Sequence, residues 1–430
     1  MESDFSTERD CAERLDREDP LSKYRCRFYI PQGSIYMLGN SLGLLSQDAE
    51  RSLMRVLEEW KSMGIQGWLG GEQPWFYFAE MLGARAAALV GAEPEEVVAT
   101  GSTTMNIHSL VSTLYELEGR RTKILADQLN FPTDIYALRS QLRLKGFDPR
   151  EHLILVRSGD GRILDEQQIV EKMTNEVALV LLPAVLYRSG QLLDMPFLTK
   201  EAHDRGILIG FDCSHSAGVV PHFFDEWGVD FGVWCGYKYL NAGPGGVAFL
   251  FLNKKHFHRV PGLAGWFGYV KEKQFDLLLE FEHAPCAGGL QISSPSILSA
   301  ASLEGSLAII LDAGVEAIRD KSIRITSYLI YLVEELLCGD PYNFCIGTPL
   351  DASRRGGHVS LEHPDEAFRI CEALNARDVV VDFRPPNVIR IAPAPLYTSY
   401  IEVWQVVQFL KEIMERKEYM TFERARKVIS

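Results

Sequence analysis

The chain has 430 residues, 47% of them hydrophobic and 24% charged, which is an ordinary globular composition with length enough for two or three domains. Its net charge of −14 argues against sequence-independent nucleic-acid binding, which needs clustered Lys and Arg to neutralise phosphates. No apolar run approaches the roughly 20 residues that span a bilayer, and the polar, acidic N-terminus lacks the pattern of a signal peptide. We therefore expect a cytoplasmic protein without nucleic-acid or membrane partners.

The eight cysteines are scattered along the chain and form no CxxC pair. Neither a metal site nor a disulfide framework is predicted from this spacing. We interpret the cysteines as reduced and mostly buried thiols.

In chain order, residues 47–62 have the period of an amphipathic helix, and the Gly-rich and aromatic segment 68–75 is expected to be a loop. From residue 97 to 252, short apolar runs alternate with helical patterns. Most runs are apolar on consecutive residues, which is typical of strands buried on both faces of a mostly parallel sheet. The expected strands are 97–100, 123–127, 152–156, 177–187, 207–213, 231–238 and 246–252, and the expected helices between them include 106–117, 134–144 and 165–174.

The pattern changes beyond residue 298. A long helical stretch, 298–337, contains Gly305 and Gly314 and is predicted to be broken. Shorter strands follow at 358–363, 378–384 and 387–393, and then a helix from Ser399. We predict an α/β large domain at 51–310, a smaller α+β C-terminal domain at 311–430, and an N-terminal segment, 1–50, associated with the small domain.

Two residues on consecutive predicted strands indicate the chemistry. Lys238 ends the run 231–238, just before a Gly-rich turn, and a desolvated lysine is a good Schiff-base nucleophile. Asp212 ends the strand before it, where an Asp can keep the pyridine nitrogen of pyridoxal phosphate (PLP) protonated. A solvent-facing lysine and a helix-capping Asp are the alternatives. Together the two are the usual arrangement in PLP enzymes of the aminotransferase-like fold.

Three further segments can complete such a site. Residues 99–104, between a strand and a helix, offer backbone N–H groups and hydroxyls to a phosphate, or simply cap the helix. Phe131 can stack on a planar ring with Asp134 nearby, or can be a plain core residue. Arg390, flanked by apolar strand residues, suits a substrate carboxylate or a structural ion pair. Neither GxGxxG nor GxxxxGK[ST] occurs, so dinucleotide and nucleoside-triphosphate binding lose their main support.

Several stretches of the chain, in this order, resemble kynureninases, from about residue 28 to the C-terminal helix. They are MLGNSLGL (37–44), TTMNIHSL (103–110), LNFPTDIYALRSQL (129–142), GFDCSHSAGVVPHFFDEWGVDFGVWCGYKYLNAGPGG (210–246), GLAGWFG (262–268) and RIAPAPLYTS (390–399). The resemblance implies a PLP-dependent, aminotransferase-like fold. It also implies hydrolytic Cβ–Cγ cleavage of L-kynurenine to anthranilate and L-alanine in tryptophan catabolism.

The resemblance also implies roles for particular residues. Catalytic roles fall to Lys238, which carries PLP through its Nζ, and to Tyr237 and Asp212. The implied cofactor-binding residues are Thr103, Thr104, Phe131, Thr133, Asp134, Asp212, His215, Tyr237, Lys238, Trp266 and Ser294. Trp266 and Ser294 are expected to come from a partner subunit, which implies a homodimer. The implied substrate-binding residues are Arg390 for the α-carboxylate, with Trp68, Asn40 and Ser41.

Three positions depart from parts of the family. Trp68 and Ser294 stand where animal members carry His and Asn near the substrate ring, which favours kynurenine over 3-hydroxykynurenine as the better substrate. Pro183 stands where many relatives have a hydroxyl residue and cannot supply its hydrogen bond. The alternatives are a cysteine desulfurase-like or transaminase reaction on the same fold, with Cys345 as the nearest candidate for a reactive thiol, and a catalytically silent binding protein.

Overall fold

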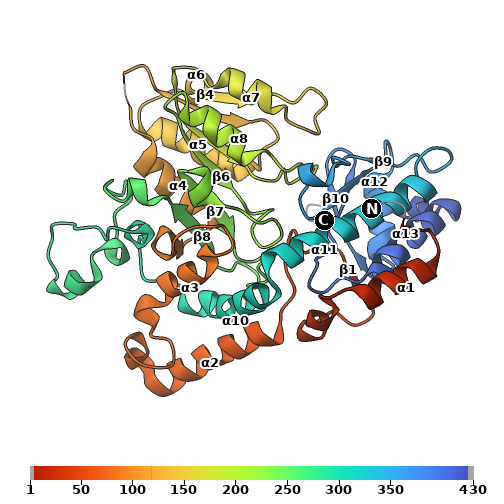
Figure 1. The fold of residues 1–430 in the computed structure, drawn as a ribbon, viewed down its shortest axis with the longest axis horizontal. Helices are drawn as coiled ribbons and strands as arrows, with labels where there is room; N and C mark the ends of the chain where they lie inside the picture. Colours follow the sequence, from red (N-terminus) through yellow and green to blue (C-terminus); the bar gives the residue numbers. More distant parts are fainter. Residues whose placement is uncertain (1–3, 118, 425–430) are drawn as a thin grey trace.

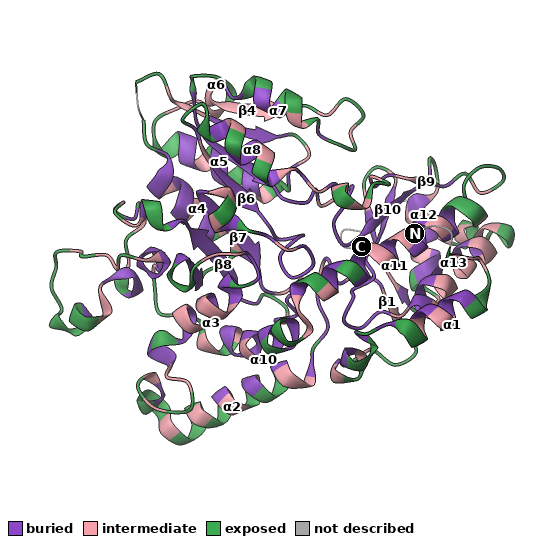
Figure 2. Ribbon diagram, in the orientation of Figure 1, coloured by how far each residue is buried: buried purple, intermediate pink, exposed green. Residues whose placement is uncertain are grey.

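The computed structural model describes residues 4–117 and 119–424, and these form two lobes (Figure 1). The larger lobe is built on a seven-stranded sheet, and the smaller one on a four-stranded sheet. Helix α11 (Val315–Leu336) runs from the larger lobe into the smaller one. Buried residues are concentrated in the two sheets and on the helix faces that cover them (Figure 2).

The large sheet has the strand order β2-β8-β7-β6-β5-β3-β4. The five strands β3 to β7 are parallel to one another, and β8 is antiparallel to both of its neighbours. All seven residues of β5 are buried, as consecutive apolar residues predict for a strand covered on both faces. The mostly parallel sheet is thereby confirmed. Its strands are β2 (Val97–Ala99), β3 (Lys123–Asp127), β4 (Leu153–Val156), β5 (Val177–Pro183), β6 (Leu208–Asp212), β7 (Phe231–Cys235) and β8 (Ala248–Leu252).

Two helices of the large lobe begin earlier than the sequence pattern suggests. Helix α4 (Thr103–Leu114) starts at Thr103 because the Ser102 hydroxyl accepts from the N–H of Met105 and caps it. Helix α5 (Pro132–Leu144) starts at Pro132, whose ring favours the first helical position. The predicted site residues Thr103, Thr104, Thr133 and Asp134 therefore lie in first turns, where backbone N–H groups are free of intrahelical partners. The remaining helices of this lobe are α2 (Gln47–Met63), α3 (Phe78–Ala87), α6 (Pro149–His152), α7 (Glu166–Lys172), α8 (Met195–His203), α9 (Phe224–Trp227) and α10 (Ile297–Ala313).

The predicted break in the long helical stretch lies at Gly314, whose φ of +79° suits glycine, and the two helices α10 and α11 meet there at 77°. Gly305, by contrast, lies within α10 and does not break it. A glycine is needed there because α10 packs closely on α2. A Cβ at Gly305 would lie 2.1 Å from the carbonyl oxygen of Asp48. Within the described ranges no single helix is long and apolar enough to cross a membrane, and only the bent α10–α11 pair passes that test, by length and composition alone.

The smaller lobe has the α+β composition that was predicted. Its antiparallel sheet has the order β12-β13-β10-β9, and a short parallel pair joins β1 to β11. The N-terminal segment divides between the lobes: Cys11, Ala12 and Leu15 belong to the small-lobe core, whereas Tyr24 and Phe28 belong to the large-lobe core. The boundaries at 50 and 310 stay a prediction. The elements are β1 (Ile35–Tyr36), β9 (Cys345–Ile346), β10 (Val359–Glu362), β11 (Val379–Val380), β12 (Asp382–Arg384), β13 (Val388–Ile391), α12 (Ala367–Asn375) and α13 (Tyr400–Glu415).

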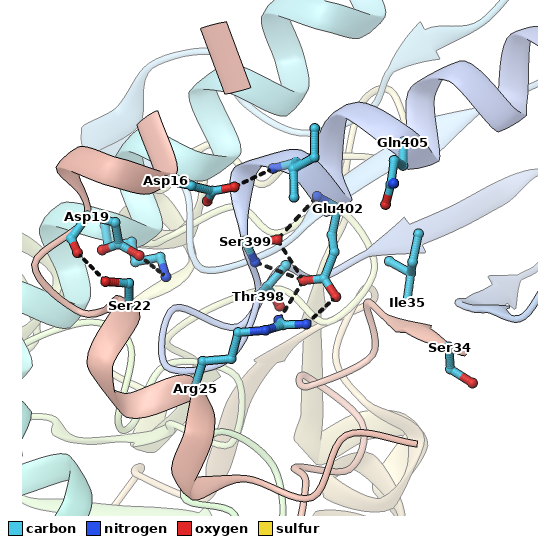
Figure 3. Close-up of a pocket in the computed structure, with 12 residues that line it drawn as sticks. Asp16, Asp19, Ser22, Arg25, Ser34, Ile35, Thr398, Ser399, Glu402 and Gln405 are labelled. Atoms are coloured by element: carbon cyan, nitrogen blue, oxygen red, sulfur yellow. Dashed lines mark hydrogen bonds and ion pairs between the residues drawn. The ribbon is translucent and has the colours of Figure 1, made fainter. Parts of the chain in front are cut away.

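The chain's first helix, α1 (Arg9–Glu18), lies beside α13, and hydrogen bonds and an ion pair join this part of the chain to the N-terminus of α13 (Figures 1 and 3). The Asp16 carboxylate accepts from the N–H groups of Tyr400 and Ile401, at 2.7 and 3.0 Å, at the positive N-terminus of α13. Arg25 pairs with Glu402 at 2.7 Å, beside a cavity of about 550 Å³. These contacts hold α1 and the turn after it against the N-terminus of α13.

The cysteines are less buried than predicted. Four of the eight are buried, Cys286 is half-buried, and Cys26, Cys338 and Cys345 are exposed. Cys345 lies in β9, the edge strand of the small sheet.

Candidate active site

Lys238 lies beside the carboxyl end of β6, in the turn that follows β7. The sequence prediction placed it at the end of the strand, but β7 ends at Cys235 and Lys238 is three residues further on. Its Nζ is 3.1 Å from Nε2 of His215 and 6.0 Å from the ring centroids of both Phe131 and Tyr237. Strands β6 and β7 are parallel neighbours, so Asp212 and Lys238 project from the same edge of the sheet.

Three carboxylates gather at this edge. Asp212 ends β6 and accepts from the N–H of Ser214 at 2.8 Å, and Asp134 lies in the first turn of α5. Asp134 is fully buried, and within the described ranges neither of its carboxylate oxygens has a hydrogen-bond partner. Burial raises the pKa of Asp134 well above its usual range, Asp212 raises it further, and Lys238 opposes the shift.

Asp127, at the end of β3, was missed by the sequence prediction. Its Oδ1 accepts from the N–H of Leu129 at 2.8 Å, and burial raises its pKa to about 7. Its position at the end of an apolar parallel strand was a signal that could have identified it.

The surroundings of Lys238 fit a flat, phosphorylated, cationic ring. The Asp212 carboxylate, at the end of β6, matches a protonated ring nitrogen, and the fully buried Asp134 lies next to it. The Phe131 side chain is 44% exposed and therefore offers a ring face, while Tyr187 packs against it edge-on at 5.3 Å. The hydroxyls of Thr104 and Thr133 lie 2.7 Å apart in the first turns of α4 and α5, which suits a phosphate. We call Lys238, His215, Asp212, Asp134 and Phe131 the lysine cluster.

His215 is buried between Lys238 and a second histidine. Burial lowers the pKa of His215, and the charges of Lys238 and Arg390 lower it further, so the ring is neutral and can accept a hydrogen bond from Nζ of Lys238. The ring of His358 lies 5.8 Å away and is fully buried, and burial lowers its pKa to about 3. No sequence pattern singled out His358.

The loop with Asn40 and Ser41 connects the lysine turn to the small lobe. The N–H of Gly43 donates to the Tyr237 carbonyl at 2.7 Å, and a Cβ at Gly43 would lie 2.3 Å from the Lys238 carbonyl oxygen, so only glycine fits there. At its other end the loop pairs with Ala392, two residues after Arg390. Asn40 is fully buried, and its side-chain nitrogen and oxygen have no partner within the described ranges. Burial raises the pKa of Tyr237.

Arg390 lies in β13, buried, and is not a surface residue. It pairs with Asp382 and donates through Nη1 to the carbonyl of Tyr187 at 2.9 Å. The structural ion pair that the sequence left open is therefore formed, while binding of a substrate carboxylate stays a prediction. Pro183, the last residue of β5, lies opposite Asp212 of β6 in the register of the sheet.

Three of the predicted residues lie elsewhere. Trp68, Trp266 and Ser294 line a cavity of about 520 Å³ together with Phe267 and Phe275, and no member of the lysine cluster lines it. Trp68 packs against Trp75 and Phe267, with ring centroids 6.0 and 5.8 Å apart. We call these five lining residues the aromatic cavity. Within one chain, the structure does not bring them to Lys238.

Comparisons with known proteins agree with this geometry. The family model described as aminotransferase class-V matches residues 79–346, and that of the kynureninase C-terminal domain matches residues 318–410. Kynureninases from Geobacillus thermodenitrificans and Shouchella clausii are 58% and 54% identical, each over 97% of this chain and 97% of the relative. Kynureninase from Bacillus anthracis is 56% identical over 96% of both chains.

Solved structures show the same fold at lower identity. A cysteine desulfurase from Thermococcus onnurineus superposes with a TM-score of 0.76 at 19% identity, covering 94% of this chain and 98% of its own. A C-DES variant with glycine covalently linked to its PLP cofactor has a TM-score of 0.74 at 17% identity, covering 90% and 99%. At such identities the likeness concerns the fold alone. The high identity over nearly the full length, together with the two family models, establishes that this chain belongs to the kynureninase family, on the PLP-dependent aminotransferase class-V fold.

Proposed function

We propose that the chain hydrolyses the Cβ–Cγ bond of L-kynurenine to give anthranilate and L-alanine, with Lys238 as its central catalytic residue. The observation that carries this proposal is the Lys238–His215 contact of 3.1 Å, next to two buried carboxylates, in a chain 58% identical to a kynureninase over 97% of its length. The desulfurase-like structures share only 15–19% identity. The exposed Cys345 lies in an edge strand of the small lobe, which gives a desulfurase reaction no support.

The lysine cluster holds the cofactor and sets its charge. When PLP is bound, Asp212 would hold a proton on the pyridine nitrogen, Phe131 would cover one ring face, and Thr103, Thr104, Thr133 and Tyr237 would hold the phosphate. When bound, PLP supplies an electron sink that stabilises negative charge at the α- and β-carbons of the substrate. Burial and the neighbouring Asp212 raise the pKa of Asp134, so Asp134 would be the proton-bearing member of this carboxyl pair, and Asp212 the member that faces the cationic ring.

Lys238 moves the protons of the reaction. Its amine takes the α-proton of the substrate and later returns it to Cα of the alanine product, while the proton that Cβ gains comes from the added water. Neutral His215, 3.1 Å away, stabilises the resulting ammonium. Water adds to the ketone carbon next to the substrate ring, and the Cβ–Cγ bond breaks with anthranilate as the leaving fragment. Arg390 binds the α-carboxylate, and the loop of Asn40 and Ser41, which is bridged to Ala392, lines the site beside it.

The exposed apolar surface around the aromatic cavity supports a homodimer. Ile65, Leu69, Phe275 and Leu277 are 67–80% exposed, and Leu279 is fully exposed. Segment 271–283 projects from the larger lobe at the left of Figure 1. A contiguous apolar surface of this kind is typical of an interface. A second copy seated on it would receive Trp266 and Ser294 as parts of its own site, in a cytoplasmic enzyme of tryptophan catabolism that binds neither nucleic acid nor membrane.

The substrate ring is proposed to lie against Trp68 and Ser294. These two residues replace the His and Asn that animal members place near the hydroxyl of 3-hydroxykynurenine, so the unsubstituted ring is favoured.

The test compares two substrates with and without the lysine. The purified protein, loaded with PLP, is incubated with L-kynurenine or 3-hydroxy-L-kynurenine, and the aromatic amine and alanine are measured. Faster turnover of L-kynurenine, lost in Lys238→Ala, is the expected result. Faster turnover of the hydroxylated substrate would contradict the role of Trp68 and Ser294. A protein that binds PLP but turns over neither substrate would contradict the proposed reaction.

A further inference from the structure

Four lysine and arginine residues are buried in the ranges that the structure describes, and they differ in how their charge is balanced. Lys321 and Arg390 each form an ion pair with an aspartate. Arg319 and Arg355 are 9% and 1% exposed, and neither forms an ion pair with any described residue. A cationic side chain is ordinarily paired when it is buried, because removing its charge from water is costly. The surroundings of Arg319 and Arg355 therefore lack a negative charge.

Arg319, in α11, uses only part of its hydrogen-bonding capacity. Its Nη2 donates to the carbonyls of Ala352 and Arg355, at 2.8 and 2.9 Å. Its Nη1 carries two further N–H donors, is buried, and has no partner among the described residues. Burial and the nearby charge of Arg355 lower the pKa of Arg319 to about 10, so the guanidinium is still a cation at neutral pH. Nη1 is thus a charged donor that is free to bind an acceptor.

Arg355 adds a second positive charge to this region. Its guanidinium donates to one carbonyl and to two hydroxyls, which are neutral groups and leave its charge in place. Asp320 raises the pKa of Arg319, and Asp351 raises that of Arg355, but neither carboxylate forms an ion pair with these arginines in the described part of the chain. The two arginines together therefore favour a negatively charged ligand.

Tyr239 provides a second unused donor beside the same segment of chain. Its hydroxyl is buried and has no partner within the described ranges, and a Cβ at Gly357 would lie 2.8 Å from it. Gly357 is two residues after Arg355, whose carbonyl accepts from Arg319. Arg319 and Tyr239 also act on the pKa of each other. Burial raises the pKa of Tyr239, so its hydroxyl keeps the proton and can donate it in a hydrogen bond.

We propose that Nη1 of Arg319 and the hydroxyl of Tyr239 bind a small monovalent inorganic anion such as chloride, and that the charge of Arg355 strengthens this binding. Both donor atoms are covered by the surrounding chain, which favours an ion of one or a few atoms. The anion connects α11, which runs between the two lobes, to the residue that follows Lys238 (Figure 1). The site lies outside the lysine cluster and does not depend on the proposed reaction.

The first experiment is crystallography of the PLP-loaded wild-type protein in bromide, with data collected at the bromine absorption edge. An anomalous peak in contact with Nη1 of Arg319 and the Tyr239 hydroxyl is the expected result. A map without such a peak, or one with a water molecule at this position, overturns the proposal. This measurement needs no variant and therefore does not depend on whether a substituted protein folds.

The second experiment follows the melting temperature of the PLP-loaded protein while chloride replaces gluconate at constant ionic strength. Relative to Arg319→Gln, chloride should raise the melting temperature of the wild type by on the order of 1 to 2 °C and in a saturable way, as for a ligand at about ten times its dissociation constant. Arg324→Gln is the matched control. Arg324 lies on the same helix, is 39% exposed and pairs with Glu18 at 3.2 Å, so this variant should respond as the wild type does.

Tyr239→Phe tests the second donor by removing one hydroxyl. The chloride concentration that gives half of the response should rise about tenfold, as for the loss of one hydrogen bond to a charged group. An unchanged half-saturating concentration in Tyr239→Phe, or the same chloride response in the wild type and Arg319→Gln, overturns the site. If Arg319→Gln does not fold, the bromide map and Tyr239→Phe decide.

Discussion

The lysine cluster and the aromatic cavity differ in how completely one chain builds them. The lysine cluster combines buried charged groups at strand ends and helix first turns, where the parallel sheet brings them together. The aromatic cavity is lined by large apolar side chains, and several of these, such as Phe275, are more than two-thirds exposed. One chain therefore assembles the lysine cluster by its own topology, whereas in the proposed homodimer the wall for the substrate ring would come from the second copy.

After the loss of turnover expected for Lys238→Ala, the largest effect is expected at Asp212. Asp212→Ala removes the group that holds the ring nitrogen protonated, and the loss of one preorganised electrostatic partner costs about a hundred- to a thousandfold in rate. Steady-state kinetics at saturating PLP measures this loss. Asp225→Ala, at an exposed ion pair with Lys254, is the control and should keep its rate. A fall of less than tenfold for Asp212→Ala would contradict the assignment.

A substitution at Asp127 tests whether the ionisation of a buried carboxyl group in this region makes the stability of the protein depend on pH. Its pKa of about 7 in the folded state lies above the unfolded value of 3.8, so the folded protein binds the extra proton between these values. Its contribution to stability is therefore complete below about pH 4 and is lost as the pH rises through 7. Relative to Asp127→Asn, the wild-type apoprotein should lose about 3 kcal/mol of unfolding free energy between pH 5 and pH 8.

Urea unfolding of both apoproteins across this pH range measures the Asp127 effect without stabilisation by a bound cofactor. Parallel pH profiles for the two proteins would show that Asp127 is ionised throughout and that burial does not control its pKa.

The next effect concerns the aromatic cavity and its surroundings. Phe275→Glu with Leu279→Glu places charges on the exposed apolar surface and should weaken dimerisation at least about a hundredfold, as for two interface hot spots. Sedimentation velocity measures the dimer, and activity should fall with it. Leu144→Glu, at a side chain that is 74% exposed on α5, is the matched control. A doubly substituted protein that remains dimeric would contradict the proposed interface.

The same comparison explains what the sequence could predict. The parallel sheet, the break at Gly314 and the Asp212–Lys238 pair follow from apolar periodicity and from residues at strand ends. The starts of α4 and α5 were missed because Ser102 and Pro132 begin those helices before the apolar pattern does. Asp382 and His358 were not found, because their contacts with Arg390 and His215 depend on strand register and on the packing of one lobe against the other.

The smallest effect is expected for substrate preference. Trp68→His with Ser294→Asn places the side chains of the animal members at both positions, and one hydrogen bond to the ring hydroxyl changes the discrimination between two substrates by about tenfold. The ratio of kcat/KM for 3-hydroxykynurenine to that for kynurenine should rise by this factor, while the dimer and the bound PLP are unchanged. Because these side chains lie in the aromatic cavity and not in the lysine cluster, kcat for kynurenine should fall much less than in Asp212→Ala. An unchanged ratio would mean that the cavity contributes to assembly and not to recognition of the substrate ring.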